Sequence, residues 1–169
     1  MTPEHDDYLC TTYPLLFKDR HGSPAKTLMC WGFACGDGWY SILDVLCRRL
    51  MEPYDRLQAD ITVAREMIEK HQTSDHEHPV WSAKYLHELT EEFDALRLPV
   101  MVQVKEKFGR LRVYVDHEDA MARALIGFAE SMSAVTCENC GARGRARGGS
   151  WIKTKCDACA DSDAYGHGV

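Results

Sequence analysis

Hydrophobic residues recur at steps of three and four in four stretches of the chain, which is the spacing that forms one apolar face on an α-helix. The predicted helices cover residues 38–51, 54–71, 80–96 and 118–133. Asp37 is the predicted N-cap of the first helix, and Pro53 is placed in the first turn of the second, where proline is tolerated. The four apolar faces are formed by Trp39, Ile42, Leu43, Leu46 and Leu50; by Leu57, Ile61, Ala64, Met67 and Ile68; by Trp81, Tyr85, Leu89, Phe93 and Leu96; and by Met121, Leu125, Phe128 and Met132.

Between residues 99 and 115 the hydrophobic period changes to two, which is the spacing of a β-strand. Phe108-Gly109 is the predicted turn between two antiparallel strands. Alternation directs five of the side chains toward a core, namely Val102, Val104, Leu111, Val113 and Val115. The opposite face carries Lys105, Lys107, Arg110, Arg112 and Tyr114. Residues 1–27 are predicted to be mostly irregular, so the fold class is predicted as α+β, with helices packed on a small antiparallel sheet.

Two Cys-x2-Cys pairs near the carboxyl end are separated by fifteen residues, namely Cys137 with Cys140 and Cys156 with Cys159. This spacing is typical of a four-thiolate zinc site, in which the ligands form a tetrahedron. Gly141 tolerates the backbone of a tight turn after the first pair, and Gly148-Gly149 is the predicted tip of a hairpin that returns to the second. We therefore predict a bound Zn²⁺ ion. Two disulfides or four buried thiols are the alternative interpretations.

Four thiolates leave no open coordination position, so the predicted zinc ion is structural. The predicted zinc ribbon, residues 135–160, is too small to fold by apolar burial alone, and metal binding should supply its folding free energy. A core domain is predicted over residues 1–134 and a flexible tail over residues 161–169. Chelation should unfold residues 137–159 and spare most of the core.

The net charge of −6 is distributed unevenly over the 169 residues. Residues 137–159 carry +3 and the remainder −9, which argues against a general DNA coat. The acidic start lacks the apolar segment of a signal peptide, and no apolar run approaches the roughly 18–20 residues of a membrane span. Eight cysteines without a secretion signal indicate thiols in a reducing cytoplasm, free or bound to metal.

The ribbon sequence alternates basic and small residues, and its candidate binding residues are Arg143, Arg145, Arg147 and Trp151, followed by Lys153 and Lys155. Such a surface can neutralise phosphates while Trp151 stacks on a base. An acidic protein surface is a second possible partner. The third interpretation is that the arginines only solubilise the module and Trp151 forms its small core.

The predicted hairpin carries a second group of cations on its polar face, namely Lys105, Lys107, Arg110 and Arg112. Arginine binds a phosphate through two donors and lysine as a point charge, so the group is a candidate site for a nucleotide or a nucleic-acid backbone. An ordinary solvated strand face has the same composition.

Residues 29–40 are dense in glycine, cysteine and aromatic residues and form a candidate ligand loop with Trp31, Asp37 and Trp39. The alternative role of Asp37 is the helix cap described above. Four further cysteines could form a second metal site or be small buried thiols; they are Cys10, Cys30, Cys35 and Cys47.

Evidence for an enzyme is limited. The chain has no nucleophile elbow, phosphate-binding Walker loop or His-Glu-x-x-His motif. A nucleophilic pair of Cys10 or Cys30 with a remote histidine stays open, because such pairs are close in space and not in sequence. His76-Glu77-His78 is expected to be a solvated loop.

Four segments occur in an order that resembles a group of small proteins encoded by tailed bacteriophages and prophages: Tyr13-Pro14-x-Leu16-Phe17, Met29-Cys30-Trp31-Gly32-Phe33-x-Cys35-Gly36-Asp37-Gly38-Trp39, Val104-Lys105-Glu106-Lys107-Phe108-Gly109-x-Leu111-Arg112 and Cys137-Glu138-x-Cys140-Gly141. Residues 53–98 contribute little to the resemblance, and Arg110 stands where the group usually has glycine. The resemblance implies a viral accessory protein in the bacterial host cytoplasm, and it implies no reaction.

Three classes of function remain after these considerations. The first is an accessory protein that binds a host protein or a nucleic-acid complex, in host takeover or anti-defence. The second is a capture protein for a nucleotide or another phosphorylated small molecule. The third is a metal- or thiol-dependent hydrolase.

Overall fold

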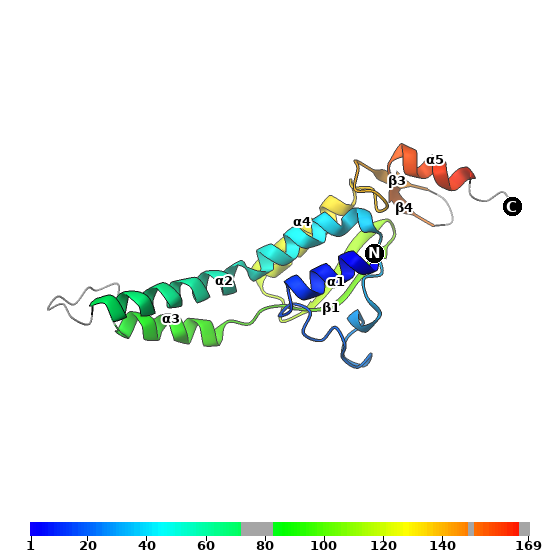
Figure 1. The fold of residues 1–169 in the computed structure, drawn as a ribbon. Coiled ribbons are helices and arrows are strands. Elements are labelled where there is room, and N and C mark those ends of the chain that lie inside the picture. Colours follow the sequence, from blue (N-terminus) through cyan, green and yellow to red (C-terminus); the bar gives the residue numbers. More distant parts are fainter. Residues whose placement is uncertain (72–82, 149–150, 166–169) are drawn as a thin grey trace. The chain divides into compact units, whose positions relative to one another are not determined.

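The computed structural model describes residues 1–71, 83–148 and 151–165. The predicted α+β class is confirmed, because these residues form five α-helices and two small antiparallel hairpins (Figure 1). Internal contacts divide the chain into two units, Met1–Leu50 with Pro99–Val169, and Met51–Leu98. The ribbon therefore belongs to the same unit as the β-hairpin, and the separate unit is helical.

The first unit contains the predicted hairpin, with strand β1 over Val100–Lys107 and strand β2 over Arg110–Asp116. Phe108 and Gly109 form the turn and have φ angles of 53° and 75°, as a two-residue turn of type I′ requires. The register shifts between Met101 and Gln103. This bulge interrupts the alternation, so Met101 is buried while Val102 is only half-buried. Val104, Leu111 and Val113 are buried as predicted, and Val115 is half-buried.

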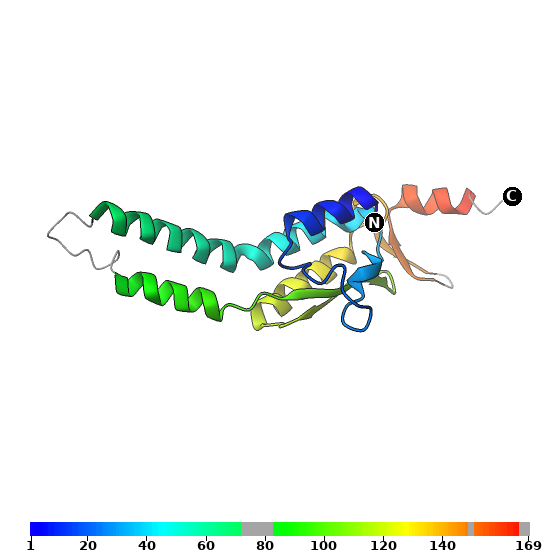
Figure 2. The same ribbon diagram turned by 60° about the horizontal axis from the view of Figure 1, so that its bottom comes forward.

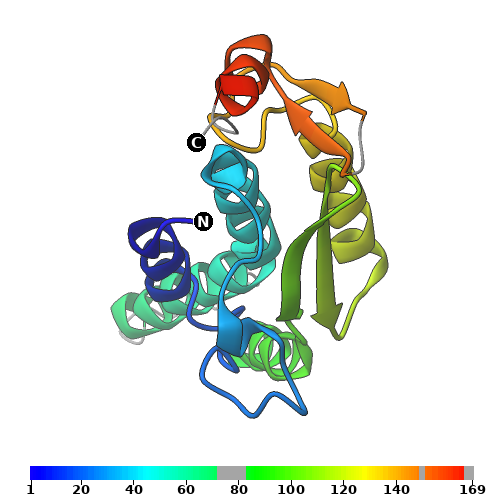
Figure 3. The ribbon, with the colours of Figure 1, turned by 90° about the vertical axis from the view of Figure 1, so that its right-hand side faces the viewer.

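The outer edge of β2 is covered by helix α4, Ala120–Ser133, which lies beside it in Figure 3. The Leu111 N–H donates to Ser133 Oγ at 2.9 Å and the Val113 N–H to Glu130 Oε1 at 3.2 Å. Glu130 Oε2 also accepts a hydrogen bond from Arg112 Nη1 at 2.5 Å. Side chains of α4 thus satisfy backbone donors that an edge strand would otherwise leave unpaired.

The outer edge of β1 is covered by the loop that precedes helix α2. The Leu28 N–H donates to Val102 O at 2.8 Å and the Ala34 N–H to Val104 O at 3.0 Å. The Glu106 N–H in turn donates to Ala34 O at 2.8 Å. The two-stranded sheet is therefore held on both sides, which compensates for its small size.

The prediction that α4 buries its large apolar residues is wrong. Met121 and Phe128 are 63% and 67% exposed, Met132 is 39% exposed, and Leu125 is half-buried. The buried residues lie one position later along the helix and are Ala122, Ile126, Ala129 and Ser133. Both faces have helical spacing. The face with Ser133 is turned toward the hairpin, where Ser133 and the neighbouring Glu130 accept hydrogen bonds from the β2 backbone.

The amino-terminal region contains one helix that the prediction of a mostly irregular segment missed, while residues 13–27 form turns and bends, as predicted. Helix α1 spans Pro3–Thr12, with Thr2 as its N-cap and Pro3 in the first turn. Leu9 is its only buried residue among those described, so no apolar face marks the helix in the sequence. The Asp6 carboxylate, which pairs with Arg20 at 2.9 Å, holds α1 to the following loop.

Helix α2 runs without interruption over Tyr40–His71, so the predicted break at Pro53 is wrong. Proline removes one backbone donor and usually disrupts a helix interior. Here Leu50 and Met51 are buried just before Pro53 and Leu57 just after it. Tertiary packing on both sides of the proline therefore maintains the helix. The predicted start of the first helix at residue 38 is close to the observed start of α2, because a 3₁₀ turn over Asp37–Trp39 leads directly into α2.

The second unit pairs α2 beyond Met51 with helix α3, Ala83–Ala95 (Figure 2). Its core consists of Leu57, Ile61, Ala64 and Leu89. The Tyr54 and Phe93 rings add a contact, with centroids 5.0 Å apart. Trp81, the predicted start of the third helix at residue 80 and the His76-Glu77-His78 loop lie outside the described residues.

The ribbon contains strands β3, Arg145–Arg147, and β4, Lys153–Lys155, which pair antiparallel. Part of the predicted hairpin tip at Gly148-Gly149 lies outside the described residues. Helix α5, Asp157–Tyr165, follows β4. Residues 161–165, predicted to start a flexible tail, therefore continue a helix.

We expect Glu130→Ala to lower the free energy of unfolding by about 1–3 kcal/mol, because it removes the acceptor of the Val113 N–H and the partner of the partly buried Arg112. Glu118→Ala is the matched control. It breaks the more exposed Glu118–Arg123 ion pair and should cost about 0–1 kcal/mol. Urea denaturation followed by circular dichroism measures both, and equal losses would contradict the role assigned to Glu130.

Candidate metal centre

Four cysteine sulfurs meet in the ribbon, where they are positioned to hold a metal ion. Their Sγ atoms lie within 4.8 Å of one another, and the residues are Cys137, Cys140, Cys156 and Cys159. The Cys140 and Cys156 sulfurs are 3.6 Å apart. A tetrahedral ion with metal–sulfur bonds of about 2.3 Å places its sulfurs about 3.8 Å apart. The donor set and its spacing therefore fit a four-coordinate thiolate site.

Two tight turns aim the sulfurs inward. In the first knuckle, residues 137–141, the Gly141 N–H donates to Cys137 O at 2.9 Å. Gly141 has a φ of 76°, a conformation that costs glycine little. The second knuckle is the first turn of α5, where the Ala160 N–H donates to Cys156 O at 3.0 Å and the Cys159 N–H lies 3.4 Å from Cys156 Sγ.

The thiols differ in acidity according to the donors around them. Burial alone would raise the pKa of Cys137, but backbone N–H groups of Cys156, Cys140 and Asn139 outweigh it and lower the pKa to about 6. Hydrogen bonds with the Cys140 and Cys156 thiols raise the pKa of Cys159 to about 12. Four thiolates this close repel one another, so a cation is needed to keep all four deprotonated.

The first knuckle packs directly on the glycine loop, residues 36–38. The Gly38 N–H donates to Glu138 O at 2.8 Å, and the Gly36 N–H donates to Glu138 Oε1 at 3.1 Å. A Cβ on Gly38 would lie 2.1 Å from Cys137 O and 2.8 Å from the Cys140 nitrogen. Only glycine allows the two backbones to come this close.

Trp39, proposed as part of a ligand loop, is fully buried and supports the same contact. Its Nε1–H donates to Thr136 O at 2.9 Å, just ahead of the first knuckle. Trp31, by contrast, is 71% exposed. The structure therefore does not bring the two rings together around one ligand.

Asp37 holds the amino-terminal segment and makes no side-chain cap for α2. Its Oδ1 accepts the Thr2 N–H at 2.6 Å and lies 3.3 Å from His5 Nδ1. Burial acts to raise the pKa of Asp37, but the hydrogen bonds from Thr2 and His5 lower it below its usual value.

A charged triad that was not predicted from the sequence links the ribbon to the hairpin. Lys153 Nζ lies 2.7 Å from Glu106 Oε2 and 3.1 Å from Glu138 Oε2, and both carboxylate side chains are only 7% exposed. Although burial opposes both shifts, the contacts lower the pKa of Glu106 and raise the pKa of Lys153. Lys153 therefore stabilises the fold by joining the ribbon to the hairpin. The available signal in the sequence was Glu106, an isolated acid between Lys105 and Lys107.

The predicted ribbon arginines line a hollow of about 520 Å³, the arginine hollow, together with Lys155. Arg145 Nη2 lies 3.0 Å from Asp157 Oδ1, and Arg147 pairs with the same oxygen. Hydrogen bonds from Arg147 and the charge of Arg145 lower the pKa of Asp157. Among the described residues that line the hollow, Asp157 is the one acid, and it lies with three arginines.

The hairpin cations do not converge into one clamp. Arg112 is bound to Glu130 on α4. Lys105 Nζ lies 5.2 Å from the centre of the Tyr114 ring, and Lys107 Nζ lies 5.5 Å from that of Phe108. Arg110 is exposed beside the turn.

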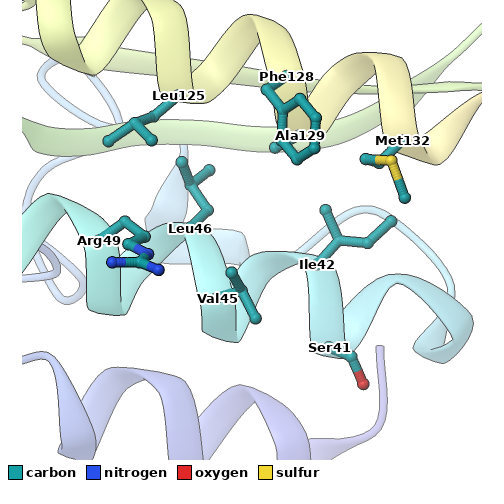
Figure 4. A pocket seen from close by; sticks show the side chains of 9 residues that line it. All are labelled: Ser41, Ile42, Val45, Leu46, Arg49, Leu125, Phe128, Ala129 and Met132. Carbon is teal, nitrogen blue, oxygen red and sulfur yellow. The ribbon is translucent and has the colours of Figure 1, made fainter.

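A separate apolar groove of about 390 Å³ lies between α2 and α4 (Figure 4). It is lined by Ser41, Ile42, Val45, Leu46, Arg49, Leu125, Phe128, Ala129 and Met132. Its residues include those that the sequence placed in the core. Apart from Arg49 the lining has no ionisable group, so it offers little for catalysis.

The remaining cysteines do not assemble into a second metal site. Among residues 1–71, 83–148 and 151–165, the ribbon quartet is the only group of three or more metal-binding side chains found close together. Burial raises the pKa of Cys10 to about 11 and that of Cys35 to about 12, and it raises the pKa of Cys47 as well. These thiols are poorly suited to act as nucleophiles at neutral pH. Cys30 Sγ lies 3.3 Å from Thr27 O.

Comparisons with protein-family models, curated proteins and solved structures gave no match to this chain. Within the described part of the chain, every helix is too short or too polar to cross a membrane. The geometry of the ribbon and hairpin is therefore the basis for a functional proposal.

We expect Gly38→Ala to weaken metal binding and to lower the free energy of unfolding by about 1–3 kcal/mol, because its methyl group overlaps the Cys137 carbonyl. Gly127→Ala on α4 is the control, since nothing lies within 4 Å of the added Cβ. It should stabilise the helix by about 0.5–1 kcal/mol. Metal content and urea denaturation measure the effects, and unchanged metal affinity in Gly38→Ala would show that the knuckle does not depend on this contact.

Proposed function

We propose that this protein is a zinc-stabilised nucleic-acid-binding protein whose ribbon contacts the phosphate backbone. The observation that carries the proposal is the arginine hollow, which is lined by Arg143, Arg145 and Arg147 and has Asp157 as its one acid among the described residues. Guanidinium groups bind phosphate oxygens through two parallel hydrogen bonds. Asp157 fixes two of the arginines while leaving the hollow with a net positive charge.

Zinc is the metal that fits the donor set best. Four thiolates in a tetrahedron are the usual ligands of structural zinc, although iron also accepts them. Such a site is closed, so the metal contributes folding free energy and no reaction. The role of the metal is then to hold β3 and β4 so that the arginines keep their positions.

The distribution of charge supports a restricted contact with nucleic acid. Lys, Arg, Asp and Glu give the ribbon residues 137–159 a charge of +3 and the rest of the chain −9. Four thiolates with one Zn²⁺ ion add −2, so the metal-loaded ribbon carries about +1 and remains the basic part of an acidic chain. The acidic remainder repels phosphates, so the basic ribbon would be the side that approaches them. The resemblance to phage-encoded proteins extends the proposal to a nucleoprotein complex of a bacterial host.

The two other classes of function have weaker support. Capture of a nucleotide in the aromatic loop would need Trp39, whose ring is buried against the ribbon. A thiol hydrolase would need a reactive cysteine, whereas the pKa values of Cys10 and Cys35 are raised by burial.

We expect purified protein to contain one zinc ion per chain, which elemental analysis measures. On chelation, hydrogen exchange should increase in residues 137–159 and also in the glycine loop, because the knuckle supports that loop. The helical unit, Met51–Leu98, should change little. Stoichiometric iron, or no metal, would contradict the assignment of zinc.

We expect the double variant Arg143→Ala/Arg145→Ala to weaken DNA binding. Each lost phosphate contact should reduce the slope of log K against log salt by about 0.7–0.9. Fluorescence anisotropy with a short labelled DNA, single-stranded and duplex, measures the slope. Arg56→Ala/Arg65→Ala, at exposed positions of the helical unit, is the charge-matched control. The same slope in both double variants would exclude the arginine hollow as the contact site.

A further inference from the structure

Two aromatic rings project into solvent from adjoining turns of the first unit. Phe108 at the β1–β2 turn is 71% exposed, and Trp151 ahead of β4 is 72% exposed. Rings of this size are usually buried, because exposing them forgoes the free energy of apolar burial. Neither ring forms the small core that a ribbon tryptophan could have supplied.

Direct contacts hold the two turns together. Thr154 Oγ1 donates to Gly109 O at 2.6 Å, and a Cβ on Gly109 would lie 3.2 Å from Ile152 Cγ2. Trp151 Nε1 lies 3.4 Å from Glu106 Oε2. Each ring is thus one residue away from the Gly109–Ile152 contact. Figure 3 shows the tip of the β1–β2 hairpin meeting β4.

The backbone at Phe108 makes the exposure of its ring more significant. Its φ of 53° lies in the left-handed region, which bulky side chains rarely adopt. Asparagine, aspartate or glycine normally occupies this position of such a turn. Phenylalanine is therefore unfavourable for the turn and gains little burial in return, so the fold itself does not account for it.

Positive charge surrounds the two rings. Lys107 and Arg110 are paired residues at the ends of the turn, and Lys107 Nζ lies over the Phe108 ring. Across the described residues, neither side chain has a carboxylate partner. The nearby acid, Glu106, is neutralised by Lys153. Strand pairing also places Arg147, which lines the arginine hollow, opposite Lys153, two residues along the chain from Trp151.

We infer that Phe108 and Trp151 form a stacking platform for unpaired bases, and that the nucleic acid bound by this protein is single-stranded. This inference rests on the proposed function and specifies its ligand. A ring face stacks on a base only where that base is free of a duplex neighbour, and every base has such a face. Lys107, Arg110 and the arginine hollow then neutralise the phosphates on either side of the stacked bases.

The decisive variants are Phe108→Asn and Trp151→Ala in the full-length, metal-loaded protein. Asparagine suits the positive φ, so Phe108→Asn should preserve or raise resistance to urea while it weakens binding. We expect each variant to bind a labelled single-stranded DNA about 5- to 100-fold more weakly, the effect of losing one base–aromatic stack. Wild-type protein should bind the single strand more tightly than the duplex of the same sequence.

Two further variants control for general effects of aromatic residues. Phe128→Ala removes a 67% exposed ring on α4 and should leave the affinity unchanged. Trp151→Phe keeps an aromatic ring that can stack, so it should retain affinity. A bound strand should quench the tryptophan fluorescence of this variant less than that of the wild-type protein, because the ring at position 151 is no longer a tryptophan.

The outcomes separate this inference from the proposed function. The stacking platform would be overturned if single strand and duplex bound equally and if Phe108→Asn and Trp151→Ala lost no affinity. Salt-dependent binding in that experiment would still support the proposed function. Absence of binding to either DNA or the corresponding RNA at low salt would overturn both.

Discussion

The close contact between two backbones, at the glycine loop and at the first cysteine knuckle, is the constraint on which the first unit depends. Gly36 and Gly38 lie against the carbonyls of Glu138 and Cys137, where a single methyl group would overlap. Trp39 fills the space beneath and donates to Thr136. The knuckle supplies two of the four clustered sulfurs, so a metal ion held by the cluster would support this contact as well as the ribbon. The ribbon therefore packs within the same unit as the glycine loop and the β-hairpin.

The same packing sorts the basic residues into two groups. Lys153 and Arg112 are neutralised by Glu106, Glu138 and Glu130, and they join elements of the fold. Others remain at the surface beside exposed rings or around a hollow; they are Lys107, Arg110, Arg143 and Arg145. Sequence composition presents all of these cations as equivalent. The buried or half-buried carboxylates of Glu106, Glu138 and Glu130 distinguish the structural cations from the surface group, in which Arg145 pairs only with the exposed Asp157.

Short-range patterns in the sequence predicted the elements that depend on local chemistry. The period of two and Phe108-Gly109 gave the hairpin, and the Cys-x2-Cys spacing gave the sulfur cluster. Features decided by tertiary contacts were not predictable in this way. Pro53 stays inside a helix because packing continues on both sides of it. The face of α4 was misassigned because both of its apolar faces have helical spacing, and only the bonding of Glu130 and Ser133 to β2 selects between them.

The hydrogen bond from Gly36 to the Glu138 carboxylate joins residues 102 positions apart. A ribosome adding about 5–20 residues per second therefore needs about 5–20 seconds to supply the second partner after the first. Throughout that interval the aromatic loop around Trp39 lacks its hydrogen-bond acceptors on Thr136 and Glu138. The sulfur cluster, and with it this unit, can be completed only after Cys159 has been synthesised, so any metal ion that the cluster holds is captured late in synthesis.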